Sequence, residues 1–300
     1  MITRLSYGGW KNNIKLSNEQ IELVATLDVG PRIIRFAAAG GQNVLKEYPE
    51  QLGGAGEADW QIRGGHRLWH APEAIPRSYF PDNDPVACEE IGDWGIRLTP
   101  QPETTYGVQK QMEITMAETQ NMVTVTHRIT NIGAWDIELA AWALTVMDAG
   151  GLEILPLPGK QPHGEVLAPG FPLVVWPYTD LADPRLRLGT RYITLRQDAS
   201  RGPIKIGLGL ELGWAAYQLR GDLFVKYFDY DPNAIYPDFG CSFETFTRQD
   251  MLEVESLSPL ALLAPGDMIE HTETWQLFTD VPAVSTEEEI DTHIRPLIAV

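Results

Sequence analysis

The chain has 300 residues, of which 44% are hydrophobic and 21% charged, the composition of a globular protein with enough apolar mass for a sizeable core. Its formal net charge is −18, and its 23 basic residues form no run of the kind that binds phosphate backbones, so we expect no nucleic acid partner. The chain shows neither an apolar signal core nor a stretch near the roughly 20 apolar residues of a membrane span. We therefore expect a cytoplasmic protein with no membrane partner.

The sequence also constrains the role of the cysteines and the number of domains. Cys88 and Cys241 are too far apart for a metal or redox motif, and both are expected to be reduced core residues. The chain offers no nucleotide or zinc motif, so no cofactor and no metal are predicted. Length alone does not set the domain count, but composition shows no break, and we predict one domain over 1–300.

The first unusual segment, Arg63–Glu73, reads RGGHRLWHAPE and lies in a long stretch, 51–84, without strand periodicity. Gly64 and Gly65 allow a sharp turn, and Pro72 prevents a helix from running through. The segment therefore predicts a shaped loop lined with titratable and stacking groups, suited to a small polar ligand. Its candidate catalytic residues are His66 and His70, because histidine titrates near neutral pH, and its candidate ligand contacts are Arg63, Arg67, Trp69 and Glu73.

The middle of the chain alternates apolar and polar residues with a period of two. Segments 111–116 and 123–130 predict two strands joined by a turn at 118–121, and 136–147 is apolar on both faces, as expected of a central strand. In the second segment His127 falls on the apolar face, which favours a buried core histidine. His271, on a later strand beside Glu273, is interpreted in the same way.

A second irregular stretch, 157–187, precedes the remaining strands. These are predicted at 191–196, 204–208, 214–219, 222–230, 251–257 and 268–278. Many strands and almost no helical periodicity indicate an all-β fold, a large antiparallel two-sheet sandwich. The one helix is expected at 285–298, where Ser285 and Glu288 form a capping box.

The strand 251–257 carries the second candidate cluster. Glu253 and Glu255 point to one face of a strand, where neighbouring carboxylates raise the pKa of one of them and poise it as an acid or base. Lys226, between two phenylalanines on its strand face, either packs by its stem or points into a cleft. Asp238 and Glu244 lie in a turn and the strand that follows it, and are weaker candidates for the same wall.

On these features the chain resembles the galactose mutarotase-like superfamily, the relatives of aldose 1-epimerases, in a branch with a GGHRLWHAPE loop. The resemblance spans most of the chain. It rests on the β pattern, the histidine segment, the LEVE strand at 252–255 followed by LAPGD at 263–267, and a last strand at 272–278. The resemblance implies a two-sheet supersandwich with a sugar bound in an open cleft on a concave face.

In such enzymes a glutamate takes the proton of the anomeric hydroxyl and a histidine protonates the ring oxygen. The resemblance therefore implies Glu253 or Glu255 as the base, and His66 or His70 as the first active-site histidine. Trp142 stands where the family has its second histidine, so the two histidines of the loop are expected to supply the acid.

Two functions follow as hypotheses. One is an aldose epimerase or mutarotase acting on a small sugar. The other is a carbohydrate-binding protein that keeps the cleft for a sugar or oligosaccharide, with Trp69 stacking on it and Arg63, Arg67 and Lys226 holding its polar groups. A lyase or hydrolase on the same scaffold is the third possibility. The sequence does not predict the oligomeric state.

Overall fold

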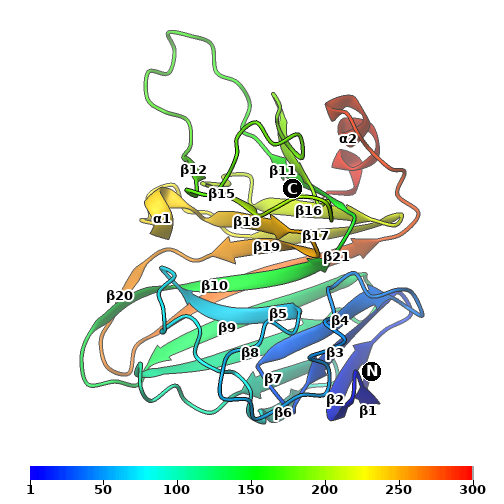
Figure 1. The fold of residues 1–300 in the computed structure, drawn as a ribbon, viewed down its shortest axis with the longest axis vertical. Helices are drawn as coiled ribbons and strands as arrows, with labels where there is room; N and C mark the ends of the chain where they lie inside the picture. Colours follow the sequence, from blue (N-terminus) through cyan, green and yellow to red (C-terminus); the bar gives the residue numbers. More distant parts are fainter. Residues whose placement is uncertain (299–300) are drawn as a thin grey trace.

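The computed structural model describes residues 1–298, which form two antiparallel sheets packed over a shared apolar core (Figure 1). The predicted all-β class and two-sheet architecture are confirmed. The first sheet has 11 strands: in order β1 (Ile2–Tyr7), β2 (Trp10–Ser17), β3 (Ile21–Thr26), β4 (Arg32–Ala38), β5 (Gly65–Ala71), β10 (Ile137–Asp148), β19 (Met251–Leu257), β18 (Phe243–Arg248), β15 (Ile204–Leu208) and β12 (Leu173–Val175), with β20 (Ala261–Leu263) paired to β10.

The second sheet has 10 strands: in order β13 (Leu186–Leu188), β14 (Tyr192–Arg196), β11 (Leu152–Pro156), β16 (Trp214–Leu219), β17 (Asp222–Phe228), β21 (Met268–Phe278), β9 (Met122–Asn131), β8 (Val108–Met116), β7 (Gly95–Thr99) and β6 (Ala87–Ile91). The short helical elements are α1 (Pro237–Gly240), α2 (Glu287–His293) and the 3₁₀ turn η1 (Arg295–Leu297). No helix within residues 1–298 has the length and apolarity needed to cross a membrane.

The period-two patterns produce the core as predicted. Along β9 every second residue is buried, and His127 is among the buried ones with no exposed surface. β10 lies between β5 and β19 and is buried on both faces from Leu139 to Met147. A strand covered on both sides has no polar face, which is why its sequence reads as continuously apolar.

The segment predicted as a loop is instead strand β5, and all seven of its residues are buried. Gly64 and Gly65 have φ of 78° and 67°, and a Cβ atom on either would lie about 2 Å from a backbone carbonyl oxygen of a neighbouring strand or loop. The glycines therefore let the chain turn closely into the sheet rather than shape a loop. The loop prediction is wrong because polar residues interrupt the apolar pattern typical of a central strand.

The terminal helix is confirmed but is shorter than predicted. The capping box joins Thr286 and Glu289, one residue later than expected, and α2 ends at His293 before the 3₁₀ turn. The stretch 157–187 contains the short strands β12 and β13, and Figure 1 shows the connection from β11 to β12 extending away from the sheets.

Candidate functional site

The candidate site is a cleft of about 520 Å³ on the face of the first sheet that points away from the second sheet. Seven aromatic side chains line it: Trp60, Trp69, Tyr79, Trp142, Trp176, Tyr178 and Phe246. Charged side chains line it between these rings: Arg67, Glu73, Lys205, Arg248 and Glu253. A volume of this size and an aromatic lining with a few polar groups are typical of small-ligand sites.

Strand register explains why these residues meet. In the β5–β10 pair Trp69 lies opposite Trp142, and in the β18–β19 pair Glu244 lies opposite Glu255. Side chains two residues apart on a strand share a face, so Glu253 joins Glu255 on this side of the sheet. The predicted pairing of the two glutamates on one face is confirmed.

Arg67 forms the best-defined polar contact inside the cleft. Its Nη2 donates to Oε1 of Glu253 at 2.9 Å, and its guanidinium lies 4.5 Å from the ring centre of Trp69 and 5.2 Å from that of Trp60. Only 3% of Arg67 is exposed, yet Nε and Nη1 have no hydrogen-bond partner in the described chain. The fork therefore holds one carboxylate and keeps donors for another group.

Lys205 organises the floor of the cleft. Its ammonium lies 2.6 Å from Oε2 of Glu244 and 3.3 Å from Oε2 of Glu255. The indole Nε1 of Trp142 donates to that same oxygen of Glu255 at 2.9 Å, while Lys205 also lies over the rings of Trp142 and Trp176. The second carboxylate oxygens of both glutamates have no partner within residues 1–298.

The pKa values of Lys205, Glu244 and Glu255 are all shifted by burial and by their mutual interactions. Burial raises the pKa of Glu255 to about 7, with Lys205 opposing the rise and Glu253 adding to it. Burial likewise raises the pKa of Glu244 to about 8, again against the pull of Lys205. Burial alone lowers the pKa of Lys205, but the two carboxylates outweigh it and the net shift is upward. Near neutral pH the three groups therefore keep the lysine charged and retain a proton on the glutamate pair.

A cluster of three rings forms one wall of the cleft. Trp60, Trp69 and Tyr79 meet edge to face, with ring centres 4.8 to 5.5 Å apart. The buried Nε1 of Trp60 has no hydrogen-bond partner in the part of the chain that is described. At the rim the exposed Glu73 accepts a hydrogen bond of 2.5 Å from the hydroxyl of Tyr79.

The two histidines of β5 do not enter this cleft. His66 points between the sheets, where its Nε2 lies 2.7 Å from Nε2 of His127 and its Nδ1 lies 2.8 Å from Oγ1 of Thr145. His127 donates from Nδ1 to the carbonyl of His271, so we infer that its Nε2 accepts a hydrogen bond from Nε2–H of His66. The Nδ1 of His66 in turn accepts from the hydroxyl of Thr145. The placement of His66 with the glutamates in one cleft is therefore wrong.

His70 also faces the interior. It is 1% exposed, its Nε2 lies 3.8 Å from Glu103, and neither ring nitrogen has a hydrogen-bond partner in the described residues. Burial lowers the pKa of both His66 and His70, which keeps the rings neutral. Strand alternation separates both histidines from Arg67 and Trp69, because residues one apart on a strand point to opposite faces.

Lys226 also belongs to this interior network and is not a cleft residue. Its ammonium contacts Oε1 of Glu273 at 2.7 Å and donates to the carbonyl of Val254 at 2.8 Å, with no exposed surface. Ser256 bridges His271 and Glu273, which confirms the buried His–Glu pair predicted from the sequence. Burial lowers the pKa of Lys226, against the attraction of Glu273.

Three groups of the network, His66, His127 and Glu273, are close enough to be considered as metal ligands. Two ligands of one tetrahedral zinc lie roughly 3.3 Å apart, whereas the two imidazole nitrogens here lie 2.7 Å apart and hydrogen-bond each other. The adjacent Lys226 supplies the cation that Glu273 requires. The cluster therefore fits a buried hydrogen-bond network better than a metal centre.

Two further predicted contacts lie outside the cleft. Arg63 is 1% exposed and binds Glu57, Asn83 and the carbonyl of Gln51. Asp238 lies in α1 with φ of 50°, and does not line the cavity. Their predicted role as walls of this cleft is wrong. Arg63 is close to β5 in the sequence and Asp238 lies in a turn before β18, but neither position lies on the face of the sheet that forms the cleft.

Neither Lys205 nor Trp60 is predicted as a site residue from the sequence, in which Trp142 stands out only as a departure from the family pattern. Lys205 interrupts the apolar strand IKIGL at 204–208, so a charge inside a buried strand was the available clue. Trp60 lies outside the strands in the stretch 51–84 and has no periodic pattern that would place it.

Comparison with known proteins supports the architecture. No family model matches this chain, and no curated protein matches it significantly. Among solved structures, a protein from Synechocystis sp. PCC 6803 is 11% identical, with a TM-score of 0.61 over 92% of this chain and 99% of that chain. A galactose mutarotase-like protein from Lactobacillus casei is 10% identical, with a TM-score of 0.60 over 89% of this chain and 100% of that chain.

A putative aldose 1-epimerase from Escherichia coli K12 is 15% identical, with a TM-score of 0.55 over 88% of this chain and 98% of that chain. At these identities the likeness establishes the fold, which is galactose mutarotase-like. Proteins that share a fold can have different activities, so only the residues of the cleft can indicate the function.

Proposed function

We propose that this protein, which has the galactose mutarotase-like fold, binds a carbohydrate in the cleft above β5, β10 and β19. The observation that carries the proposal is a set of three unused donor nitrogens, on two side chains of an aromatic wall. Arg67 offers Nε and Nη1, and Trp60 offers Nε1, on side chains that line the cavity. Buried donors without partners cost free energy, which a ligand rich in hydroxyl oxygens offsets.

The aromatic wall supports the same class of ligand. A pyranose has apolar C–H faces and polar edges, and Trp69 and Trp176 supply ring surface next to charged groups that accept and donate hydrogen bonds. Glu253 provides a carboxylate that accepts hydrogen bonds and Lys205 an ammonium that donates them. The cleft therefore suits hydroxyl groups, which both donate and accept. The likeness in fold to mutarotase-like proteins is consistent with a small sugar or oligosaccharide.

A second candidate function is sugar 1-epimerisation, and one observation favours it. The Lys205, Glu244 and Glu255 group retains a proton near neutral pH, next to the salt bridge between Arg67 and Glu253. Opening and closing of a sugar ring require a base and an acid. Glu253 and Lys205 line the cleft, and the glutamate pair contacts Lys205. No histidine lines this cleft in the described chain, so the acid predicted from the family has to be replaced by this group.

Tryptophan fluorescence and NMR titration against a panel of neutral and acidic sugars test the binding proposal. Trp176→Ala removes a half-buried ring at the cleft, and we expect it to weaken the best ligand about tenfold, equivalent to about 1.4 kcal/mol. Trp135→Ala is the matched control, because Trp135 is 82% exposed and does not line the cleft. Equal affinity in the two variants, or no binding by any sugar of the panel, contradicts the proposal.

Anomer exchange followed by NMR separates the two candidate functions. Freshly dissolved anomers of each bound sugar are compared with and without protein. An exchange rate equal to that in buffer leaves binding as the function. Acceleration that is lost in both Glu253→Gln and Glu255→Gln, with sugar still bound, establishes the epimerase instead.

A further inference from the structure

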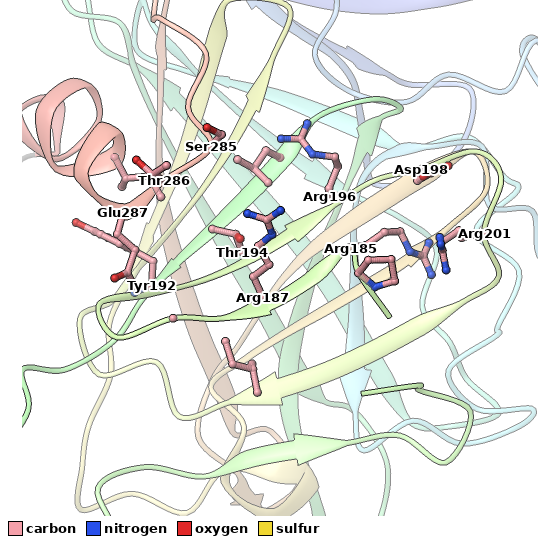
Figure 2. A pocket seen from close by; sticks show the side chains of 15 residues that line it. Arg185, Arg187, Tyr192, Thr194, Arg196, Asp198, Arg201, Ser285, Thr286 and Glu287 are labelled. Carbon is pink, nitrogen blue, oxygen red and sulfur yellow. Dashed lines mark hydrogen bonds between the residues drawn. The ribbon is translucent and has the colours of Figure 1, made fainter. Parts of the chain in front are cut away.

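A second cavity, of about 590 Å³, lies on the outer side of the second sheet, between the β13–β14 pair and the start of α2 (Figure 2). Four arginines line it, from the two strands and the segments next to them: Arg185, Arg187, Arg196 and Arg201. We call this cavity the arginine groove. It is separate from the sugar cleft, with which it shares no lining residue.

Strand pairing brings these like charges together. Arg187 lies opposite Thr194, and Arg196 is two residues further along the same face of β14. The backbone N–H of Arg196 also donates to the carbonyl of Arg185 at 3.1 Å. Cations at neighbouring positions on one face of a strand pair repel each other, and composition does not explain the cluster in a chain of net charge −18. An anion between them removes this repulsion.

Arg185 is built into the wall of the groove. It is 4% exposed, is paired through Nη2 with Oδ2 of Asp183 at 2.9 Å, and donates to the carbonyl of Gly202 at 2.6 Å. Its Nη1 is buried and has no hydrogen-bond partner within residues 1–298. This nitrogen is a fixed donor whose position is set by the two contacts of the same guanidinium.

The other three arginines are exposed, and their side chains form no hydrogen bond or ion pair with any described residue. Two carboxylates also line the groove. Glu287 forms an ion pair with Arg191 at 3.6 Å, whereas Asp198 attracts Arg201 and Arg185 of the groove itself. Asp198 accepts from the backbone and hydroxyl of Ser200, and Glu287 accepts from backbone N–H groups at 190–192. Hydrogen bonds leave the charge of Asp198 in place, so it offsets part of the positive charge, and the groove keeps a net positive charge from its three exposed arginines.

We propose that the arginine groove binds the phosphate group of a small organic or inorganic phosphate. Guanidinium forks match the oxygens of phosphate and hold them through paired, charge-assisted hydrogen bonds. A phosphate dianion or pyrophosphate neutralises more than one of the three unpaired arginines, and Nη1 of Arg185 gains an acceptor. A cavity of this volume accommodates a small molecule, while the acidic chain as a whole repels nucleic acids and anionic membranes.

The test is isothermal titration of the full chain with inorganic pyrophosphate at constant ionic strength, with chloride as the reference anion. We expect saturable binding at one site in the wild type and at least tenfold weaker binding in Arg187→Gln/Arg196→Gln. Arg4→Gln/Lys11→Gln is the matched control, because it removes the same charge from exposed positions outside the groove. The control is expected to bind like the wild type, as is Trp176→Ala in the sugar cleft.

Thermal unfolding gives a second readout that does not depend on a particular phosphate. Without ligand, Arg187→Gln/Arg196→Gln is expected to unfold at the same temperature as the wild type or a higher one, because like-charge repulsion is relieved. Pyrophosphate is expected to raise the midpoint of the wild type and leave this variant unchanged. Absence of binding to the wild type, or equal weakening in the control pair, overturns the proposal. Loss of sugar binding with intact pyrophosphate binding contradicts only the cleft.

Discussion

The two faces of strand β5 carry different chemistry. On the face toward the second sheet, His66 belongs to a buried chain of hydrogen bonds with His127, and Lys226 and Glu273 form an ion pair beside it. On the opposite face, Arg67 keeps unused donors and lines an open cleft. The network around His66 satisfies its polar groups internally, whereas Arg67 on the opposite face leaves donors for a ligand. Burial alone thus does not mark a binding residue; an unsatisfied partner inside a cavity does.

The largest effect is expected from disrupting the buried ion pair of Lys226 and Glu273 between the two sheets. Lys226→Met leaves the charge of Glu273 buried without a cation, and we expect the free energy of unfolding to fall by about 3 to 5 kcal/mol. Urea unfolding at pH 7 measures it. The double variant Lys226→Met/Glu273→Gln is the control, because removing both charges should restore part of the loss. Sugar affinity of the folded fraction is expected to stay unchanged; a parallel loss of affinity would show that the two faces are not independent.

An intermediate effect compares neighbouring positions of the same strand. Arg67→Lys keeps the charge but loses the fork that contacts Glu253, and sugar affinity should fall about tenfold, or about 1.4 kcal/mol. His70→Gln, which changes the inner face, should leave the affinity unchanged and lower stability by about 1 kcal/mol. Sugar titration and urea unfolding of both variants distinguish the faces. Weaker sugar binding by His70→Gln would show that this histidine contributes to the sugar site.

The smallest expected effect concerns pH. Burial raises the pKa of Glu255 from about 4.5 to about 7, so the folded protein holds a proton more tightly than the unfolded chain. This contribution to stability is full below pH 4.5 and is lost as the pH rises through 7. Glu255→Gln should therefore reduce the decline in unfolding free energy between pH 5 and 7 by about 1 kcal/mol per pH unit. An unchanged slope in Glu255→Gln would show that the proton is not held on this group.

Much of the fold was predictable because half-buried strands leave a period-two pattern. The expected strands 204–208, 214–219, 251–257 and 268–278 have the observed boundaries. Strand β5 was not predictable in this way, because its two faces are buried in different surroundings and both contain polar residues. For the same reason the sequence identified Arg67, Trp69 and Glu253 as candidates but joined them to His66, His70 and Lys226.

The sequence by itself determined the all-β class, the shared face of Glu253 and Glu255, and the capped terminal helix, because each depends on residues close together in the chain. Tertiary structure decided the rest. Sheet pairing placed Lys205 beside Glu244 and Glu255, and brought Trp60 to Arg67. It also sent alternate residues of one short motif to opposite sides of a sheet. Which side meets solvent and which meets the second sheet depends on contacts between strands distant in sequence, and no local pattern records them.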